Sequence, residues 1–94
     1  MKRASNTYKS KKLIRVSLEY DELNNKIHLI RITGDFFLYP EESLDKLEAN
    51  LVGTILEKDS IKQKIKNCLD DSEVFGFDSE SMTEAILGCL REVK

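Results

Sequence analysis

The feature that most constrains this fold is a pair of alternating apolar segments joined by a short turn. In Lys12–Tyr20 every second residue is large and apolar, namely Ile14, Val16, Leu18 and Tyr20. A period of two is typical of a strand with one buried face. Lys26–Thr33 is a second apolar strand, and the short turn between them predicts an antiparallel hairpin. Because a hairpin alone is marginal in water, other elements must cover its apolar face.

The second strand has a less regular pattern than the first. Ile30 and Ile32 share a face with His28, whereas Ile27 and Leu29 point the other way unless a bulge intervenes. A third, short strand around residues 6–9 would extend the sheet to three strands. Residues 1–7 are otherwise expected to form a flexible basic arm.

Three later segments have apolar residues at helical spacing. Pro40 is expected as the first residue of a helix, with Glu41 in its first turn and Gly53 stopping it. A second helix is predicted from about Lys58 to residue 69, and a third after residue 78 or 79, which can cap it. Strands followed by helices indicate an α+β fold. We therefore predict one domain over residues 1–94, with a small antiparallel sheet of two to three strands packed with about three helices.

Composition fits an ordinary globular domain: 94 residues, 40% apolar, 34% charged, with a net charge of −2. The charge is uneven, because the first 15 residues carry six bases and no acid, while the rest carry nine bases against 17 acids. The basic segment could attract phosphate or an acidic partner surface, or simply be solvated. No apolar run is long enough for a membrane span or a secretory signal. Two cysteines without a Cys-x-x-Cys motif favour the reducing cytoplasm.

Catalytic chemistry is not indicated by any residue pattern. His28 is the one histidine, and both Cys68 and Cys89 fall on predicted apolar helix faces. There is no Gly-rich phosphate loop and no metal-ligand spacing. Tyr8 alone does not make an aromatic platform for nucleic acid beside the lysines. We predict a binding module with no catalytic residue, no metal site, and neither nucleic acid nor membrane as its target.

One stretch, "ITGDFFLYPEE" at residues 32–42, fits neither a strand nor a helix period. Together with the strand "KLIRV" before it and the helix ending "LVG" after it, this stretch resembles the C-terminal accessory domain of lipoate-protein ligases. The segment "VFGFDSESMTEAIL" at residues 74–87 is similar to the family's last-helix region, although Ser79 replaces the usual proline. The residues that carry the resemblance, read as mainly structural, are Gly34, Asp35, Phe36, Phe37, Pro40, Glu41 and Gly53.

The resemblance implies a function that composition alone does not indicate. Lipoate-protein ligases form lipoyl-adenylate from ATP and lipoate, and then transfer the lipoyl group to a lysine of an acyl-carrier domain. In some members the small domain is a separate chain, needed for activation and less so for transfer. This chain then looks like the non-catalytic subunit of a bipartite ligase, with a catalytic subunit as its heterodimer partner. ATP, Mg and lipoate would be used by the complex, and none would be bound by this chain alone. The implied fold is similar to iron–sulfur scaffold proteins, without their cysteines.

Family members often have Gly-Gly-Lys before the first long strand, and here the turn reads Lys9-Ser10-Lys11-Lys12. Lys12 matches the family lysine. We expect Lys9, Lys11 and Lys12 at the rim of the adenylate site, where positive charge would favour adenylation. Two alternatives stay open at this point: a free-standing module that binds another acidic partner, and a sulfur-carrier or iron–sulfur scaffold role.

Overall fold

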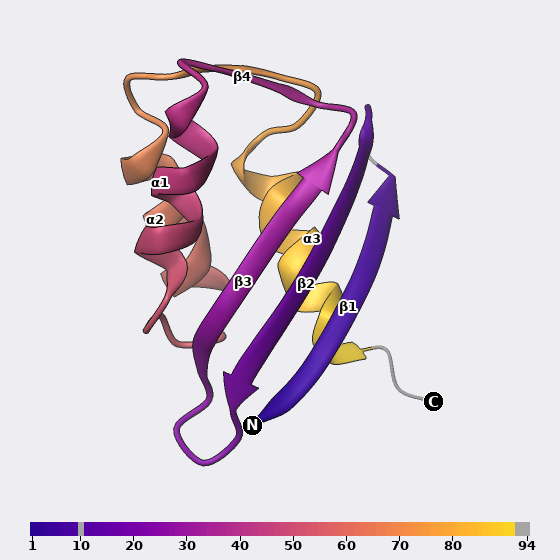
Figure 1. Cartoon of the computed structure of the whole chain (residues 1–94), viewed down its shortest axis with the longest axis vertical. Coiled ribbons are helices and arrows are strands. Elements are labelled where there is room, and N and C mark those ends of the chain that lie inside the picture. The colour runs from indigo at the N-terminus through magenta and orange to yellow at the C-terminus, as the bar shows by residue number, and fades with distance from the viewer. Residues whose placement is uncertain (10, 92–94) are drawn as a thin grey trace.

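The structure is a computed structural model that describes residues 1–9 and 11–91. A three-stranded antiparallel sheet in the order β1-β2-β3 is formed by Lys2–Lys9, Leu13–Asp21 and Lys26–Gly34. Helices α1 (Glu42–Leu51), α2 (Lys58–Cys68) and α3 (Ser79–Arg91) cover one face of this sheet (Figure 1). The predicted α+β class, with a small antiparallel sheet and three helices, is confirmed.

The hydrophobic core lies between the sheet and the helices, as the alternation in β2 predicts. Ile14, Val16 and Leu18 of that strand are buried, and their neighbours Arg15 and Ser17 are exposed. Each helix contributes one apolar stripe to the same core, at the buried positions Leu47, Leu51, Ile61, Ile65, Met82, Ala85, Ile86 and Cys89.

The predicted flexible arm is wrong, because residues 2–9 form β1 and pair with β2 along their whole length. The expected short strand at residues 6–9 is therefore part of a longer one. A tertiary contact helps to explain why this segment is an ordered strand. The Asn6 amide donates a hydrogen bond to the Ala85 carbonyl of α3 at 3.0 Å. Gly88, one turn later on that helix, leaves room for the amide, since a Cβ there would lie 2.2 Å from its nitrogen. A long-range anchor thus orders a strand whose own sequence is mostly polar.

A bulge resolves the irregular pattern of β3. Glu19 pairs with Leu29 and Tyr20 with Ile27, so His28 is an extra residue with no partner in the β2 register. The extra residue returns Ile27 to the core and turns Leu29 outward. The expectation that His28 shares a face with Ile30 is wrong for the same reason, and the imidazole is exposed.

Two further short strands form a separate ribbon. β4 (Phe37–Tyr39) pairs antiparallel with β5 (Glu73–Phe75), a segment between α2 and α3. The prediction that Pro40 begins a helix is wrong: α1 begins at Glu42, and the Tyr39–Pro40 peptide is cis. The physical reason is the ribbon, which holds the chain extended up to Tyr39, so that a turn must come first. In that turn the Pro40 carbonyl accepts a hydrogen bond from the Ser43 amide at 3.0 Å.

Candidate functional site

The lysine turn, defined here as Lys9, Lys11 and Lys12, connects β1 to β2. All three side chains are exposed, and Ser10 between them lies outside the described residues. None of the ion pairs found among residues 1–9 and 11–91 involves these lysines. The turn therefore presents three neighbouring positive charges at one end of the sheet.

The Gly34-Asp35 pair lies directly beside this turn, where β3 ends. The Asp35 amide donates a hydrogen bond to the Leu13 carbonyl at 3.0 Å. A Cβ on Gly34 would lie 2.1 Å from the same oxygen, and the residue has a φ of +156°. Glycine is required here because the end of β3 passes too close to the start of β2 for any side chain.

Phe36 joins the main sheet to the ribbon. Its ring meets that of Phe77 edge-to-face, with centroids 5.0 Å apart. A Cβ on Gly76 would lie 3.1 Å from the Phe36 Cα and 2.8 Å from Cγ of Lys12. The aliphatic stem of Lys12 is thus packed on the Gly76 backbone, which places the lysine turn against the ribbon.

The ribbon carries three aromatic side chains on its outer surface. Phe37 pairs with Phe75 across the two strands, their ring centroids 6.1 Å apart, and Tyr39 pairs with Glu73. Between them, Leu38 is buried and Val74 is half-buried, so these two side chains anchor the ribbon on the core. Alternation therefore puts Phe37, Tyr39 and Phe75 on the side away from the core, and we call these three residues the aromatic face. Figure 1 shows β4 at the same end of the molecule as the β1–β2 turn.

Asp78 follows the ribbon and caps α3. Its carboxylate accepts a hydrogen bond from the Ser81 amide at 2.7 Å, and the Ser81 hydroxyl accepts one from the Asp78 amide at 2.9 Å. This reciprocal pair is a capping box. The hydrogen bonds from Ser81 hold the pKa of Asp78 below its usual value, and the nearby charge of Lys11 lowers it further. The charge of Lys11 therefore acts on the carboxylate that caps α3.

The structure brings together only part of the predicted residue set. The lysine turn and Gly34, Asp35, Phe36 and Phe37 lie at one end of the molecule. Gly53 lies at the other end, where its amide donates to the Ile27 carbonyl at the start of β3. Glu41 is exposed and makes no capping hydrogen bond with its side chain.

Sequence patterns did not identify four further residues at this end as candidate site residues, namely Tyr39, Phe75, Gly76 and Phe77. By pattern alone, residues 72–77 are an apolar connector between the second and third predicted helices. A three-residue strand gives no usable period, so the available signal was weak. It consisted of a second pair of phenylalanines, Phe75 and Phe77, whose rings meet those of Phe37 and Phe36 in the structure.

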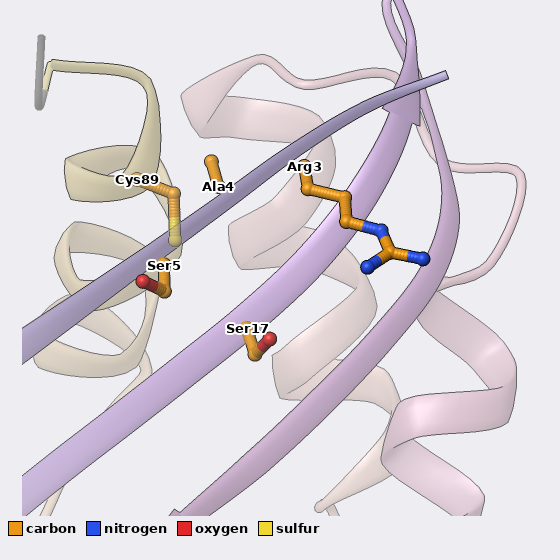
Figure 2. A pocket seen from close by; sticks show the side chains of 5 residues that line it. All are labelled: Arg3, Ala4, Ser5, Ser17 and Cys89. Atoms are coloured by element: carbon orange, nitrogen blue, oxygen red, sulfur yellow. The ribbon is translucent and has the colours of Figure 1, made fainter.

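A hollow lies elsewhere, where β1 and β2 run past α3. Figure 2 shows the side chains that line it: Arg3, Ala4, Ser5, Ser17 and Cys89. Arg3 is paired with Glu19 at 3.0 Å. The Cys89 thiol is buried and lies 3.9 Å from the carbonyl oxygens of Val16 and Ala85. Among the residues that line the hollow, no general base therefore lies beside a nucleophile.

Within residues 1–9 and 11–91, no group of three or more His, Cys, Asp or Glu side chains could hold a metal ion. No helix in the described part of the chain is long and apolar enough to cross a membrane. The described residues do form one end of the molecule at which aromatic rings and lysines are exposed together. The fold defines the class: a small α+β module with a three-stranded antiparallel sheet covered by three helices.

Comparison with known proteins narrows the class to a family. The family described as bacterial lipoate protein ligase C-terminus matches residues 10–89, and the chain belongs to it. The lipoate-protein ligase A subunit 2 of Thermoplasma acidophilum is 49% identical over 55 residues, which are 57% of this chain and 56% of that protein. The alignment thus spans about half the length of the curated relative.

A solved structure from the same organism is similar over a longer stretch. It is described as a bi-partite lipoate protein ligase and its E2 lipoyl domain, from an archaeal lipoylation system. The match has a TM-score of 0.80 and 36% sequence identity, and covers 90% of this chain and 94% of the matched one. The resemblance inferred from the residues is confirmed.

Proposed function

We propose that this chain is the non-catalytic subunit of a bipartite lipoate-protein ligase. The observation that carries the proposal is the match of nearly the whole chain to a chain of the Thermoplasma bipartite system. The catalytic subunit would be its heterodimer partner, and the lipoyl acyl-carrier domain would be met through that partner. The complex would work in the cytoplasm and use ATP, Mg and lipoate.

The chain's role in this proposal is to complete the adenylation site. Lipoate carries a carboxylate and ATP carries phosphates, so bringing them together costs electrostatic repulsion. Fixed positive charge and exclusion of water both lower the barrier of such a step. The lysine turn supplies exposed positive charge, and the packing of Lys12 against Gly76 holds it in place. Transfer from a preformed lipoyl-adenylate meets less of this repulsion and would depend less on the small subunit.

The test uses the purified chain mixed with its catalytic subunit. Pyrophosphate release measures adenylation, and lipoylation of the acyl-carrier domain from added lipoyl-adenylate measures transfer. The double variant Lys11→Glu/Lys12→Glu should slow adenylation at least about 10-fold, since single stabilising donors at reacting charges contribute this much or more. Transfer should change little.

The matched control is Lys64→Glu/Lys66→Glu, which makes the same charge change on the exposed surface of α2. It should leave both steps near the wild-type rate. Equal loss of adenylation and transfer in the lysine-turn variant would contradict a role specific to activation. No stimulation of the catalytic subunit by the wild-type chain would refute the proposed function itself.

A further inference from the structure

The outer surface of the β4–β5 ribbon is unusual in what it exposes. Phe37, Tyr39 and Phe75 are 55%, 59% and 57% exposed. The other four aromatic side chains of the protein are partly or fully buried. Among residues 1–9 and 11–91, the other exposed large apolar side chains are not aromatic and lie outside the ribbon, namely Met1, Leu23, Leu29, Val52 and Ile55. The aromatic face is therefore a concentrated feature of one six-residue ribbon.

The fold itself does not need these three rings to be apolar. The ribbon is fastened by Leu38 and Val74 on its inner side, and by the edge-to-face contact of Phe36 with Phe77. With more than half of each ring exposed, the face leaves roughly 300 Å² open to water, judged from typical aromatic side-chain areas. Apolar patches of this size on a monomer often mark an interaction site. Aromatic side chains are also the commonest energetic anchors of protein interfaces.

Charge divides the two ends of the aromatic face. Lys12 packs on Gly76 beside the Phe37–Phe75 end, where the three charges of the lysine turn outnumber the exposed carboxylates of Asp35 and Asp78. The Tyr39 end is acidic, because Glu73 pairs with Tyr39 and the exposed Glu41 and Glu42 follow it in sequence. The surface thus runs from basic, through aromatic, to acidic.

The distribution of charge along the surface favours some kinds of partner over others. A nucleic-acid strand would meet carboxylates at one end. A second copy of this chain, docked about a two-fold axis that crosses the aromatic centre, would also set basic ends against acidic ends, so self-association is the competing outcome that sedimentation must exclude. A protein segment with an apolar centre, acidic at one end and basic at the other, matches all three parts and is fixed in one direction.

We propose that the aromatic face, with the lysine turn at its basic end, is the surface through which this chain docks on the catalytic ligase subunit. The inference rests on the proposed function and adds the surface and orientation of docking. Docking here places the lysine turn at the edge of the interface, where it can reach the partner's reacting phosphates. The two groups then have separable roles: the aromatic face gives affinity, and the lysines act on adenylation.

The main test measures the dissociation constant of the complex by titration calorimetry. Phe75→Ser and Phe37→Ser should each weaken binding at least about 30-fold, the loss expected of an interface anchor. Leu29→Ser is the matched control, because Leu29 is 49% exposed on the open face of the sheet; it should change binding less than about 3-fold. Far-UV circular dichroism and thermal unfolding identify any variant that does not fold.

The separation of roles has its own readout. Raising the concentration of Phe75→Ser to saturation should restore the wild-type adenylation rate. The Lys11→Glu/Lys12→Glu variant should stay slow at saturation. If the phenylalanine variants do not fold, hydrogen exchange of the wild-type chain replaces them. Adding the catalytic subunit should then protect amides at residues 37–39 and 73–75, and unchanged exchange there would overturn the assignment.

The outcomes distinguish this inference from the proposed function. If the wild-type chain binds and stimulates the catalytic subunit while both phenylalanine variants bind as tightly, docking occurs elsewhere and only this inference fails. If the wild-type chain neither binds nor stimulates, both fail. Sedimentation showing a dimer that Phe75→Ser dissociates would assign the face to self-association. Anisotropy showing that an oligonucleotide binds through the same face would assign it to nucleic acid. Either result would overturn the proposal.

Discussion

Replacing Gly34 with alanine tests the contact that joins the two longest strands at the end that carries the lysine turn. The added Cβ would lie 2.1 Å from the Leu13 carbonyl oxygen, whereas real Cβ contacts stay above 3.0 Å. The two strands must therefore separate locally. That oxygen also accepts the hydrogen bond of the Asp35 amide, so the separation weakens this bond as well.

The magnitude follows from these two effects. Loss of one net backbone hydrogen bond costs about 1 kcal/mol. Holding a non-glycine residue in a sparsely populated backbone region costs about 1–3 kcal/mol. Alanine returns somewhat less than 1 kcal/mol by restricting the unfolded chain. We expect Gly34→Ala to lower the free energy of unfolding by about 2 kcal/mol, which for a domain of this size lowers Tm by roughly 8–16 °C.

The assay is urea unfolding followed by circular dichroism, with Gly53→Ala as the matched control. Gly53 has a φ of +88°, but nothing lies within 4 Å of the position that an added Cβ would take, so only the backbone cost remains. That variant should lose about 1–2 kcal/mol. If Gly34→Ala is no more destabilising than Gly53→Ala, the close approach to Leu13 is not the reason for glycine at position 34.

Three further predictions concern the rest of the fold. Asp78→Ala should cost about 1 kcal/mol at pH 7 through loss of the helix cap. Because folding lowers the pKa of Asp78, this stabilisation is present above its unfolded pKa of about 3.9 and is lost as the pH falls through the folded pKa. The Tm values of wild type and variant should therefore converge in strong acid. A difference in Tm that does not change with pH would contradict this prediction. Gly88→Ala should stabilise the Asn6→Ala background by about 1 kcal/mol through helix propensity, yet be neutral or worse in wild type, where the new Cβ displaces the Asn6 amide; equal effects in a double-mutant cycle would refute this. Cys89 is buried and Cys68 is half-buried, so a thiol reagent should label Cys89 far more slowly in the folded protein; rapid labelling of both would revive the sulfur-carrier alternative.

Much of the fold could be read from local patterns. The alternation in residues 12–20 makes every second side chain face the same way, whatever the strand pairs with, so Ile14, Val16 and Leu18 had to share a buried face. The helical stripes likewise follow from spacing alone. The end of β3 was recognised from its Gly-Asp pair, and the family from the residues around it.

Other features depended on neighbours far away in the sequence. β1 is ordered by an Asn6 contact with a residue 79 positions later, and its polar sequence gave no sign of this. The bulge at His28 arises because both Ile27 and Ile30 gain by facing the core, a choice made only when helices cover that side.

The end that carries the lysine turn also combines features set by local sequence with features set by distant contacts. Local sequence indicates that a strand stops at Gly34-Asp35, because this pair interrupts the apolar pattern, and that the two phenylalanines after it belong to the family's signature. Which phenylalanine is buried depends on the folded chain: Phe36 packs inward on Phe77, whereas Phe37 faces solvent beside Phe75. Those two environments depend on a strand about 36 residues further along the chain, β5, which follows α1 and α2 in sequence and pairs with β4. Burial is a property of the assembled layers, and so the exposed aromatic face beside the lysine turn emerges only when the chain is folded.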